Sequence, residues 1–371
     1  MATKTRRSKK APPSPMTLKA KLRLIVSLFA AAFAAIGVIF SLLLNDIFFS
    51  FYPGLSRSIM KPLAALSGLC PLSVWELALG LILVWAFISF LIAIGRRRKL
   101  QWFCGLICGL TIGLSLFILL WGLNHFGPTI DQKLELEKGE YSVQELTEAT
   151  AFYLSEANRY ASQVSRAADG TVQMSAFRDL ASQAADGYRA LGRETSLFHG
   201  SLQPVKPVLA WKPMSYFGTT GIFVCLTGES CVNPDTYPAS LPFTMCHEMG
   251  HRMAFAAEDE ANFCAYLACR ANESPEFRYS GAYCAFIYCY NALYEVSPAA
   301  AQKLWEYADP GIVADAKAAG AHYAKYESSV QDAAQKVNDS YLKAFQEPAG
   351  VQSYGQVTDL LIALYLSEKS S

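Results

Sequence analysis

The chain has 371 residues, of which 52% are hydrophobic and 17% are charged, a composition too apolar for an ordinary soluble protein. Its formal net charge is only +1, so no overall positive field attracts nucleic acid, and we expect no nucleic-acid partner. The ten cysteines show no paired metal-binding spacing, and we interpret most of them as small buried apolar residues.

Residues 1–20 are basic and rich in proline, which predicts a cytoplasmic tail. Each of the three apolar runs that follow is long enough to cross a hydrocarbon layer about 30 Å thick. They predict three transmembrane helices in residues 21–123, at about 24–44, 72–94 and 102–123. Glu76 is the one charge in the second run, and we expect it to reach interfacial water. Trp75, Trp102 and Trp121 lie near the ends of runs, where indole rings favour the membrane interface.

Basic residues predict the orientation of these spans. The tail and the link Arg96-Arg97-Arg98-Lys99 should both be cytoplasmic by the positive-inside rule. The chain is then a multi-pass protein of the cell membrane, with residues 124–371 outside the cytoplasm. A cleaved signal peptide is the alternative for the first span, because Ala32-Phe33-Ala34 resembles a cleavage site. The apolar run continues for about ten residues beyond it, which favours a retained anchor.

Residues 124–371 contain no further run long enough to span a membrane. Ser142 and Glu145 have the spacing of a capping box at the start of a helix, and helices are predicted at 243–255 and 258–270. Residues 221–226 form the one clear strand, with a turn at 227–230 and a return at 231–233. We therefore predict a mainly α chain, in which three N-terminal transmembrane helices precede a largely helical domain with a small β-sheet. Cys225 and Cys231 flank the turn and could form a disulfide.

The sequence His247-Glu248-Met249-Gly250-His251 carries the clearest chemical signal. Histidines four residues apart project from the same helix face, where both imidazoles can bind one Zn²⁺ ion at about 2.0–2.1 Å. Glu248 could lie beside the metal without binding it and act as the general base for a zinc-activated water. The alternative is a solvated polar stripe. Apolar neighbours such as Phe243, Met245 and Cys246 argue against it, because buried histidines and carboxylates need partners.

A catalytic zinc normally takes a third protein ligand, and the nearest source is Glu258-Asp259-Glu260-Ala261-Asn262. On an unbroken helix Glu258 would lie about 10 Å beyond His251 along the axis. The chain must therefore turn after about Ala256 to bring the next helix back to the metal. An acidic cluster is also common at a helix N-terminus without any metal.

The two segments together resemble the gluzincins, the zincin metallopeptidases whose third ligand is a glutamate. That resemblance implies Glu258 as the ligand and Asn262, four residues later, as the residue that orients an imidazole. Glu260 is the alternative ligand. Zincins usually carry an uncharged residue after the second histidine, whereas this chain has Arg252, which we expect to point to solvent.

Further segments resemble the DUF3810 family of uncharacterised bacterial membrane proteins, which have three predicted spans and a gluzincin-like HExxH domain. The resemblance covers nearly the whole chain after the tail and implies the architecture and the metal site, but no substrate. It is carried by Trp121-Gly122-Leu123-Asn124, Tyr141-Ser142-Val143-Gln144-Glu145-Leu146, Leu241-Pro242-Phe243-Thr244, Glu276-Phe277-Arg278-Tyr279-Ser280-Gly281 and Ser353-Tyr354-Gly355-Gln356-Val357-Thr358-Asp359.

Zincins commonly present a sheet edge beside the active-site helix, where a peptide substrate adds as a strand. Residues 221–226 could be that edge or a plain core strand. Tyr279 is the foremost candidate donor to the developing oxyanion, and Arg278, Tyr283 and Tyr354 are others. We interpret His199 and His322 as surface or capping residues, and His125 as lying at the membrane interface.

The sequence thus predicts a membrane-anchored zinc metallopeptidase whose substrate is a peptide or cell-envelope protein at the bilayer surface. A second hypothesis is a membrane sensor or interaction protein that binds zinc but cleaves nothing, or only itself. A third, a transporter component, is weak because the spans contain almost no polar residues.

Overall fold

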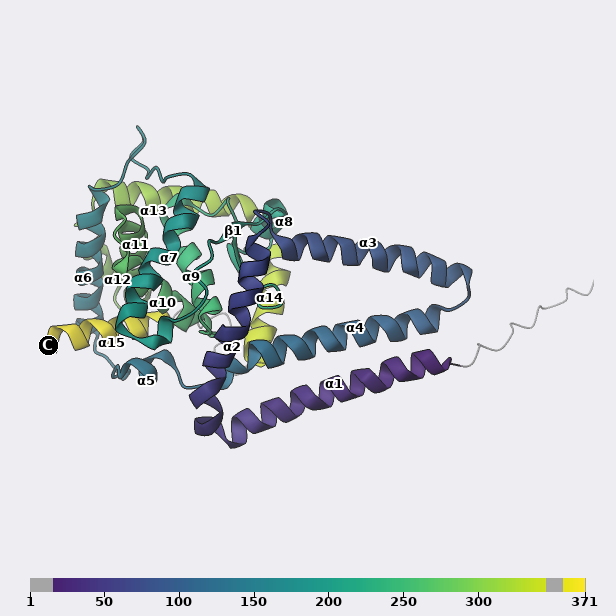
Figure 1. Ribbon diagram of the computed structural model, residues 1–371. Helices are drawn as coiled ribbons and strands as arrows, with labels where there is room; N and C mark the ends of the chain where they lie inside the picture. Colours follow the sequence, from purple (N-terminus) through teal and green to yellow (C-terminus); the bar gives the residue numbers. More distant parts are fainter. Residues whose placement is uncertain (1–15, 345–355, 371) are drawn as a thin grey trace, which may run out of the picture.

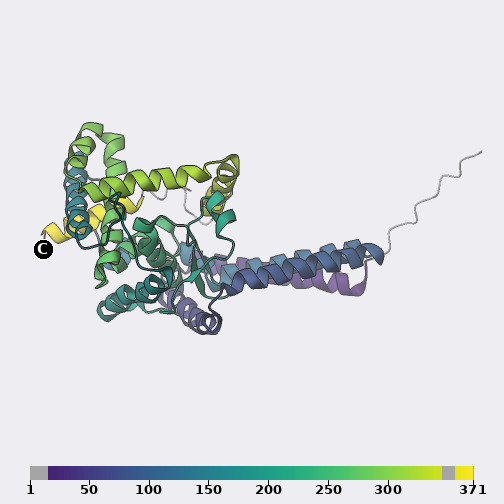
Figure 2. The same cartoon turned by 90° about the horizontal axis from the view of Figure 1, so that it is seen from above.

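The computed structural model describes residues 16–344 and 356–370. A helical body carries three long helices that extend from it to the same side (Figure 1), and a view from above shows them still grouped (Figure 2). The predicted fold class is confirmed. The described chain is mainly α, with three candidate membrane spans followed by helices and a small three-stranded sheet.

The three candidate spans are apolar on nearly all sides. The second and third spans begin and end within a few residues of the predicted runs at 72–94 and 102–123. The first span begins six residues before the predicted start at 24. Few of their residues are buried inside the protein, which suits a lipid environment. These helices mark the chain as a membrane protein, and they are α1 (Leu18–Leu43), α3 (Val74–Gly95) and α4 (Lys99–Leu120).

The sequence did not predict α2 (Asn45–Gly68), a long helix between the first two spans. In Figure 1 it crosses the direction of the spans and lies along the body. One face is buried, at positions three or four residues apart as helical periodicity requires. That face consists of Phe48, Phe49, Tyr52, Ser56, Met60, Ala64 and Ser67. The helix therefore packs on the body although it precedes the predicted domain boundary at 123/124.

The helices of the body surround a core formed mainly by α6, α9, α10 and α11. Ser142 and Glu145 make the predicted capping box, each side chain accepting from the other residue's backbone N–H. The body helices are η1 (Gly122–Phe126), α5 (Ile130–Leu134), α6 (Val143–Ala161), α7 (Phe177–Glu194), η2 (Ser196–Phe198), α8 (Trp211–Tyr216), η3 (Pro238–Ser240), α9 (Leu241–Arg252), α10 (Glu258–Ala271), α11 (Pro275–Val296), α12 (Pro298–Trp305), α13 (Pro310–Tyr323), η4 (Ala324–Tyr326), α14 (Ser329–Ala344) and α15 (Gln356–Ser370).

The sheet has the strand order β1 (Lys206–Pro207), β3 (Glu229–Val232), β2 (Gly221–Val224), so β2 forms one edge. Strands β2 and β3 are antiparallel, and Ile222 pairs with Cys231. Cys225 therefore lies three residues farther along its strand than the partner of Cys231. Both thiols are free in the described structure, so the predicted disulfide is wrong.

Two carboxylates, Glu229 and Glu76, join the second span to the body. Glu229 of β3 accepts hydrogen bonds from the first amides of α3, Val74 N and Trp75 N, both at 2.9 Å. Lys206 Nζ lies 2.7 Å from Glu229 and donates to Ser67 O at the end of α2. Glu76 does not simply reach water as expected, because its carboxylate accepts from two backbone amides of the body, at 209 and 210. The free amides at a helix N-terminus attract carboxylates, and here they fix α3 to the sheet.

Candidate metal centre

The histidine motif lies on α9, and the second acidic segment begins α10, as the sequence predicted. Helix α9 ends at Arg252, three residues before the predicted end at 255. Ala254 adopts a left-handed conformation with φ 72°, which is rare for a residue with a Cβ. It lets the chain reverse within five residues and places Glu258 at the first position of α10. The hydrophobic core holds both helices together.

The side chains of His247, His251 and Glu258 meet at one point. Their facing nitrogen and oxygen atoms all lie within 4.8 Å of one another. The two Nε2 atoms are 3.1 Å apart, and Glu258 carboxylate oxygens lie 3.3 Å from His247 Nε2 and 3.7 Å from His251 Nε2. Tetrahedral zinc with bonds of 2.0–2.1 Å requires ligand atoms about 3.3 Å apart. The spacing of this triad therefore fits a zinc ion.

Each imidazole is oriented by a bond on its other nitrogen. His251 Nδ1 lies 2.9 Å from Phe255 O, and His247 Nδ1 lies 2.8 Å from Asn262 Oδ1. Since a carbonyl oxygen only accepts, both Nδ1 atoms carry hydrogen and both Nε2 lone pairs face Glu258. Three acceptors that face one another need a cation or an added proton between them. Asn262 thus lies where the resemblance to gluzincins implies.

The carboxylates of this region differ in electrostatic environment. Burial alone would raise the pKa of Glu258, but the adjacent His247 and His251 imidazoles lower it to about 2. For Glu248 burial dominates and, with Glu258 adding to it, raises the pKa to about 8 despite the opposing effect of His247. Glu248 is 4% exposed, and its Oε2 has no hydrogen-bond partner among the described residues. An incoming polar group would satisfy that oxygen.

Glu260, the alternative ligand, lies away from the triad. Its Oε1 accepts a hydrogen bond from Ile130 N, the first amide of α5, at 2.6 Å. Burial raises the pKa of its carboxyl to about 7. The structure therefore brings Glu258, rather than Glu260, to the two histidines.

A cleft of about 810 Å³ opens over the triad. Residues of β2, α9, α10, α11 and α14 line it, and Phe117 and Trp121 from the body-side end of α4 complete it. Trp121 was expected at the lipid interface, but it is buried and its Nε1 donates to His251 O at 2.9 Å. The last candidate span therefore touches the backbone of the metal-site helix.

The edge strand β2 lies against Glu248. A Cβ atom on Gly221 would approach Glu248 Oε1 to 2.3 Å, so any other residue at this position would force the Glu248 side chain to move. Gly221, Ile222 and Phe223 line the cleft, and the outer edge of β2 has no partner strand among the described residues. Of the two interpretations of this strand, the structure favours a sheet edge, and this edge lies beside α9.

Tyr279 does not line the cleft. It is fully buried, and its hydroxyl donates to Asp315, which also pairs with Arg166. The structure therefore places this tyrosine in a core network, where the predicted oxyanion contact is out of reach. Tyr288 on the same helix does line the cleft, with its hydroxyl 3.4 Å from Asn262 Oδ1. Cys284 and Tyr288, four residues apart, share one helix face, and both line the cleft.

The structure also shows where three other residues singled out in the sequence lie, namely Arg252, His199 and His322. Arg252 is only 1% exposed rather than directed to solvent, and burial lowers its pKa to about 10. Its guanidinium donates to Gln203 O at 2.7 Å. His199 caps the end of α7, where Nε2 lies 2.7 Å from Gly192 O. His322 instead lines a polar pocket. Tyr354 lies outside the described residues.

Comparison with known proteins gives one match. The model of a family described as "Protein of unknown function (DUF3810)" matches residues 51–362, which include most of α2, two of the spans and the metal-site helices. No curated protein and no solved structure gives a significant match. The matched range covers most of the chain, and the protein therefore belongs to the DUF3810 family.

Proposed function

We propose that the chain is a membrane-anchored zinc metallopeptidase that hydrolyses a peptide or cell-envelope protein near the membrane surface. One observation carries this proposal: three acceptor atoms from His247, His251 and Glu258 face one another at zinc-ligand spacing. Acceptors at 3.1–3.7 Å repel unless a cation or an added proton lies between them, and a zinc ion would satisfy all three at once. Two imidazoles and a carboxylate are the ligand set of catalytic zinc in metallopeptidases.

Zinc in this position would lower the pKa of a coordinated water to about 7 and polarise a carbonyl. Glu248 supplies the proton transfer. Its buried carboxyl has a raised pKa and one oxygen without a partner among the described residues, so in its ionised form it can accept a proton from the attacking water. A carboxyl of this basicity can then hold that proton and deliver it to the leaving amine.

The cleft suits an extended peptide near a membrane. The free edge of β2 offers backbone hydrogen bonds to an added strand, and Gly221 brings that strand into contact with Glu248. Phe117 and Trp121, at the end of a candidate span, form part of the cleft. With the N-terminus cytoplasmic by the positive-inside rule, three crossings place the cleft on the outer surface of the cell membrane.

The test compares full-length wild-type protein with Glu248→Gln in detergent, both loaded with zinc, on peptides and extracted cell-envelope proteins. We expect equal zinc content and cleavage by the wild type that falls roughly 10²–10⁴-fold in the variant, the usual contribution of a general base. Equal cleavage by both proteins would refute the mechanism. Bound zinc without Glu248-dependent cleavage would favour the second hypothesis, a zinc-binding sensor.

A further inference from the structure

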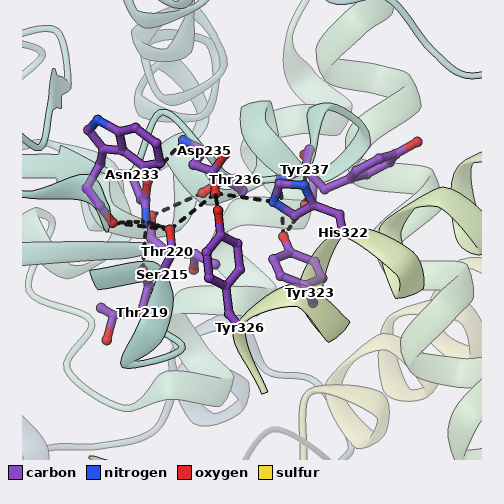
Figure 3. Close-up of polar contacts among 12 residues, drawn as sticks. Ser215, Thr219, Thr220, Asn233, Asp235, Thr236, Tyr237, His322, Tyr323 and Tyr326 are labelled. Carbon is purple, nitrogen blue, oxygen red and sulfur yellow. Dashed lines mark hydrogen bonds and ion pairs between the residues drawn. The ribbon is translucent and has the colours of Figure 1, made fainter. Parts of the chain in front are cut away.

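A second, polar pocket of about 220 Å³ adjoins the cleft. The two share Gly218, Thr219, Thr220 and Tyr323 in their linings. The volume far exceeds the roughly 10–15 Å³ that one water molecule needs. Figure 3 shows the polar side chains that gather there, from α8, the loops around β2 and β3, and the end of α13 with the following turn.

Asp235 is the carboxylate of this pocket. Its Oδ2 accepts hydrogen bonds from Tyr326 OH at 2.6 Å and from Ser215 Oγ at 3.2 Å. Asn233 holds Ser215 in place by donating to its Oγ at 2.9 Å. In Figure 3, dashed lines from Ser215, Tyr326 and His322 meet at Asp235. These donors fix the orientation of the carboxylate without cancelling its charge.

The pocket has unused capacity for a positive ligand. None of its lining residues is lysine or arginine, and Asp235 Oδ1 accepts no hydrogen bond from the described residues. His322 Nε2 lies 3.5 Å from Asp235 Oδ2 and has no hydrogen-bond partner among the described residues. Both side chains remain partly open, with 25% of Asp235 and 18% of His322 exposed. A cation entering here would meet an oriented, incompletely paired carboxylate.

The position of the pocket relates it to the metal centre. Gly221 contacts Glu248, and Thr219 and Thr220 immediately precede it. Two residues span at most roughly 7 Å, so the pocket opens about one or two residues along β2 from the general base. A peptide added to the edge of β2 would place a neighbouring residue at this opening.

We propose that this pocket is a specificity site for a positively charged nitrogen of the substrate, one or two residues from the bond to be cleaved. The inference rests on the proposed function, because it takes the ligand to be a peptide bound along β2. Two sources supply such a nitrogen, a lysine or arginine side chain and the N-terminal ammonium of the peptide. Asp235 pairs with it, and the pocket disfavours an acidic residue at the same position.

The test measures binding without cleavage. Full-length Glu248→Gln protein, loaded with zinc, is titrated with fluorescent decapeptides that carry lysine, norleucine or glutamate at each position in turn. Acetylated peptides exclude the N-terminal ammonium, and unacetylated peptides without lysine test it separately. Asp235→Asn keeps an acceptor for Tyr326 and removes the charge, and Asp235→Lys reverses it. Asp179→Asn, on the exposed face of α7, is the matched control. Zinc content and thermal unfolding report whether each variant folds.

We expect one position, or the free N-terminus, to bind a cation roughly tenfold more tightly than a neutral group, as for a charged hydrogen bond. Asp235→Asn should abolish that preference, Asp235→Lys should shift it to glutamate, and Asp179→Asn should leave it intact. Peptides that bind without a charge preference, a preference that survives in folded Asp235→Asn, or no binding at all would each overturn the inference. Cleavage by the wild type without an Asp235-dependent preference would overturn it while leaving the peptidase proposal standing. If binding depends on Asp235 but the wild type cleaves no peptide, the specificity site would stand and the peptidase proposal would be overturned.

Discussion

Replacing Asn262 by alanine tests how the metal site is held. Asn262 Oδ1 accepts from His247 Nδ1 at 2.8 Å, and no other described side chain takes that place. Residues that orient a ligating histidine typically contribute 10–100-fold to metal affinity. His251 keeps its own bond to Phe255 O at 2.9 Å, so only one imidazole is released. We therefore expect the lower end of the range, roughly tenfold weaker zinc binding, or about 1.4 kcal/mol.

The assay is a competition titration of zinc-free, full-length protein against a chromogenic zinc chelator in detergent. Asn262→Asp keeps an oxygen acceptor and should retain the wild-type affinity. Asn272→Ala is the control on the same helix, because Asn272 is buried and donates to Gln183 O at 2.9 Å, away from the metal site. It should lower the unfolding temperature and leave the zinc affinity unchanged. A folded Asn262→Ala protein with wild-type zinc affinity would refute the reasoning.

Three further predictions follow from buried groups. In metal analysis, the Glu258→Gln protein should lack zinc and the Glu260→Gln protein should keep it. The opposite result would make Glu260 the ligand in place of Glu258. Glu229→Gln should destabilise the protein by about 3 kcal/mol at pH 7, because it leaves a buried lysine unpaired. Burial opposes ionisation of Glu229, yet Lys206 and backbone amides lower its pKa, so wild-type stabilisation should fade as pH falls below about 4 in thermal scans. Gly228→Ala should lower the unfolding temperature by several degrees, since φ is 67° and the new Cβ would lie 2.6 Å from a backbone nitrogen of α2; an unchanged temperature would contradict that packing.

The parts that the sequence predicted are those set by local patterns. Apolar runs identified the three spans, because length and composition alone decide whether a helix suits a bilayer. The spacing of His247 and His251 placed both on one face of α9, since helical geometry requires it. Glu258 followed from the resemblance to gluzincins together with the need for a turn, and the structure brings its carboxylate to both histidines.

The parts that the sequence missed depend on contacts between distant segments. Helix α2 has Pro53 and Pro62 inside it, and its apolar residues cover one face rather than a continuous run, so it gave no span-like signal. Arg252 seemed suited to solvent, but the chain at Gln203 covers it and supplies its acceptor. Local sequence shows neither the surface on which α2 packs nor the backbone oxygen that accepts from Arg252.

Which face of α11 points into the cleft also depends on packing. Tyr279 and Tyr288 lie on the same helix, and only the contact of α11 with α9 and α10 decides between them. The Asp235 pocket combines residues from positions 215–236 with residues from 322–331. No spacing in the sequence relates segments so far apart, and the signal appears only once the chain is folded.

Metal analysis of the full-length protein purified in detergent is the most direct test of the zinc site. With zinc supplied during growth, we expect about one zinc ion per chain, as for a site with three protein ligands. Glu248→Gln should contain the same amount, because Glu248 is not a ligand, whereas His247→Ala/His251→Ala should contain almost none. A folded wild-type protein without zinc, or a double variant that retains it, would contradict the account.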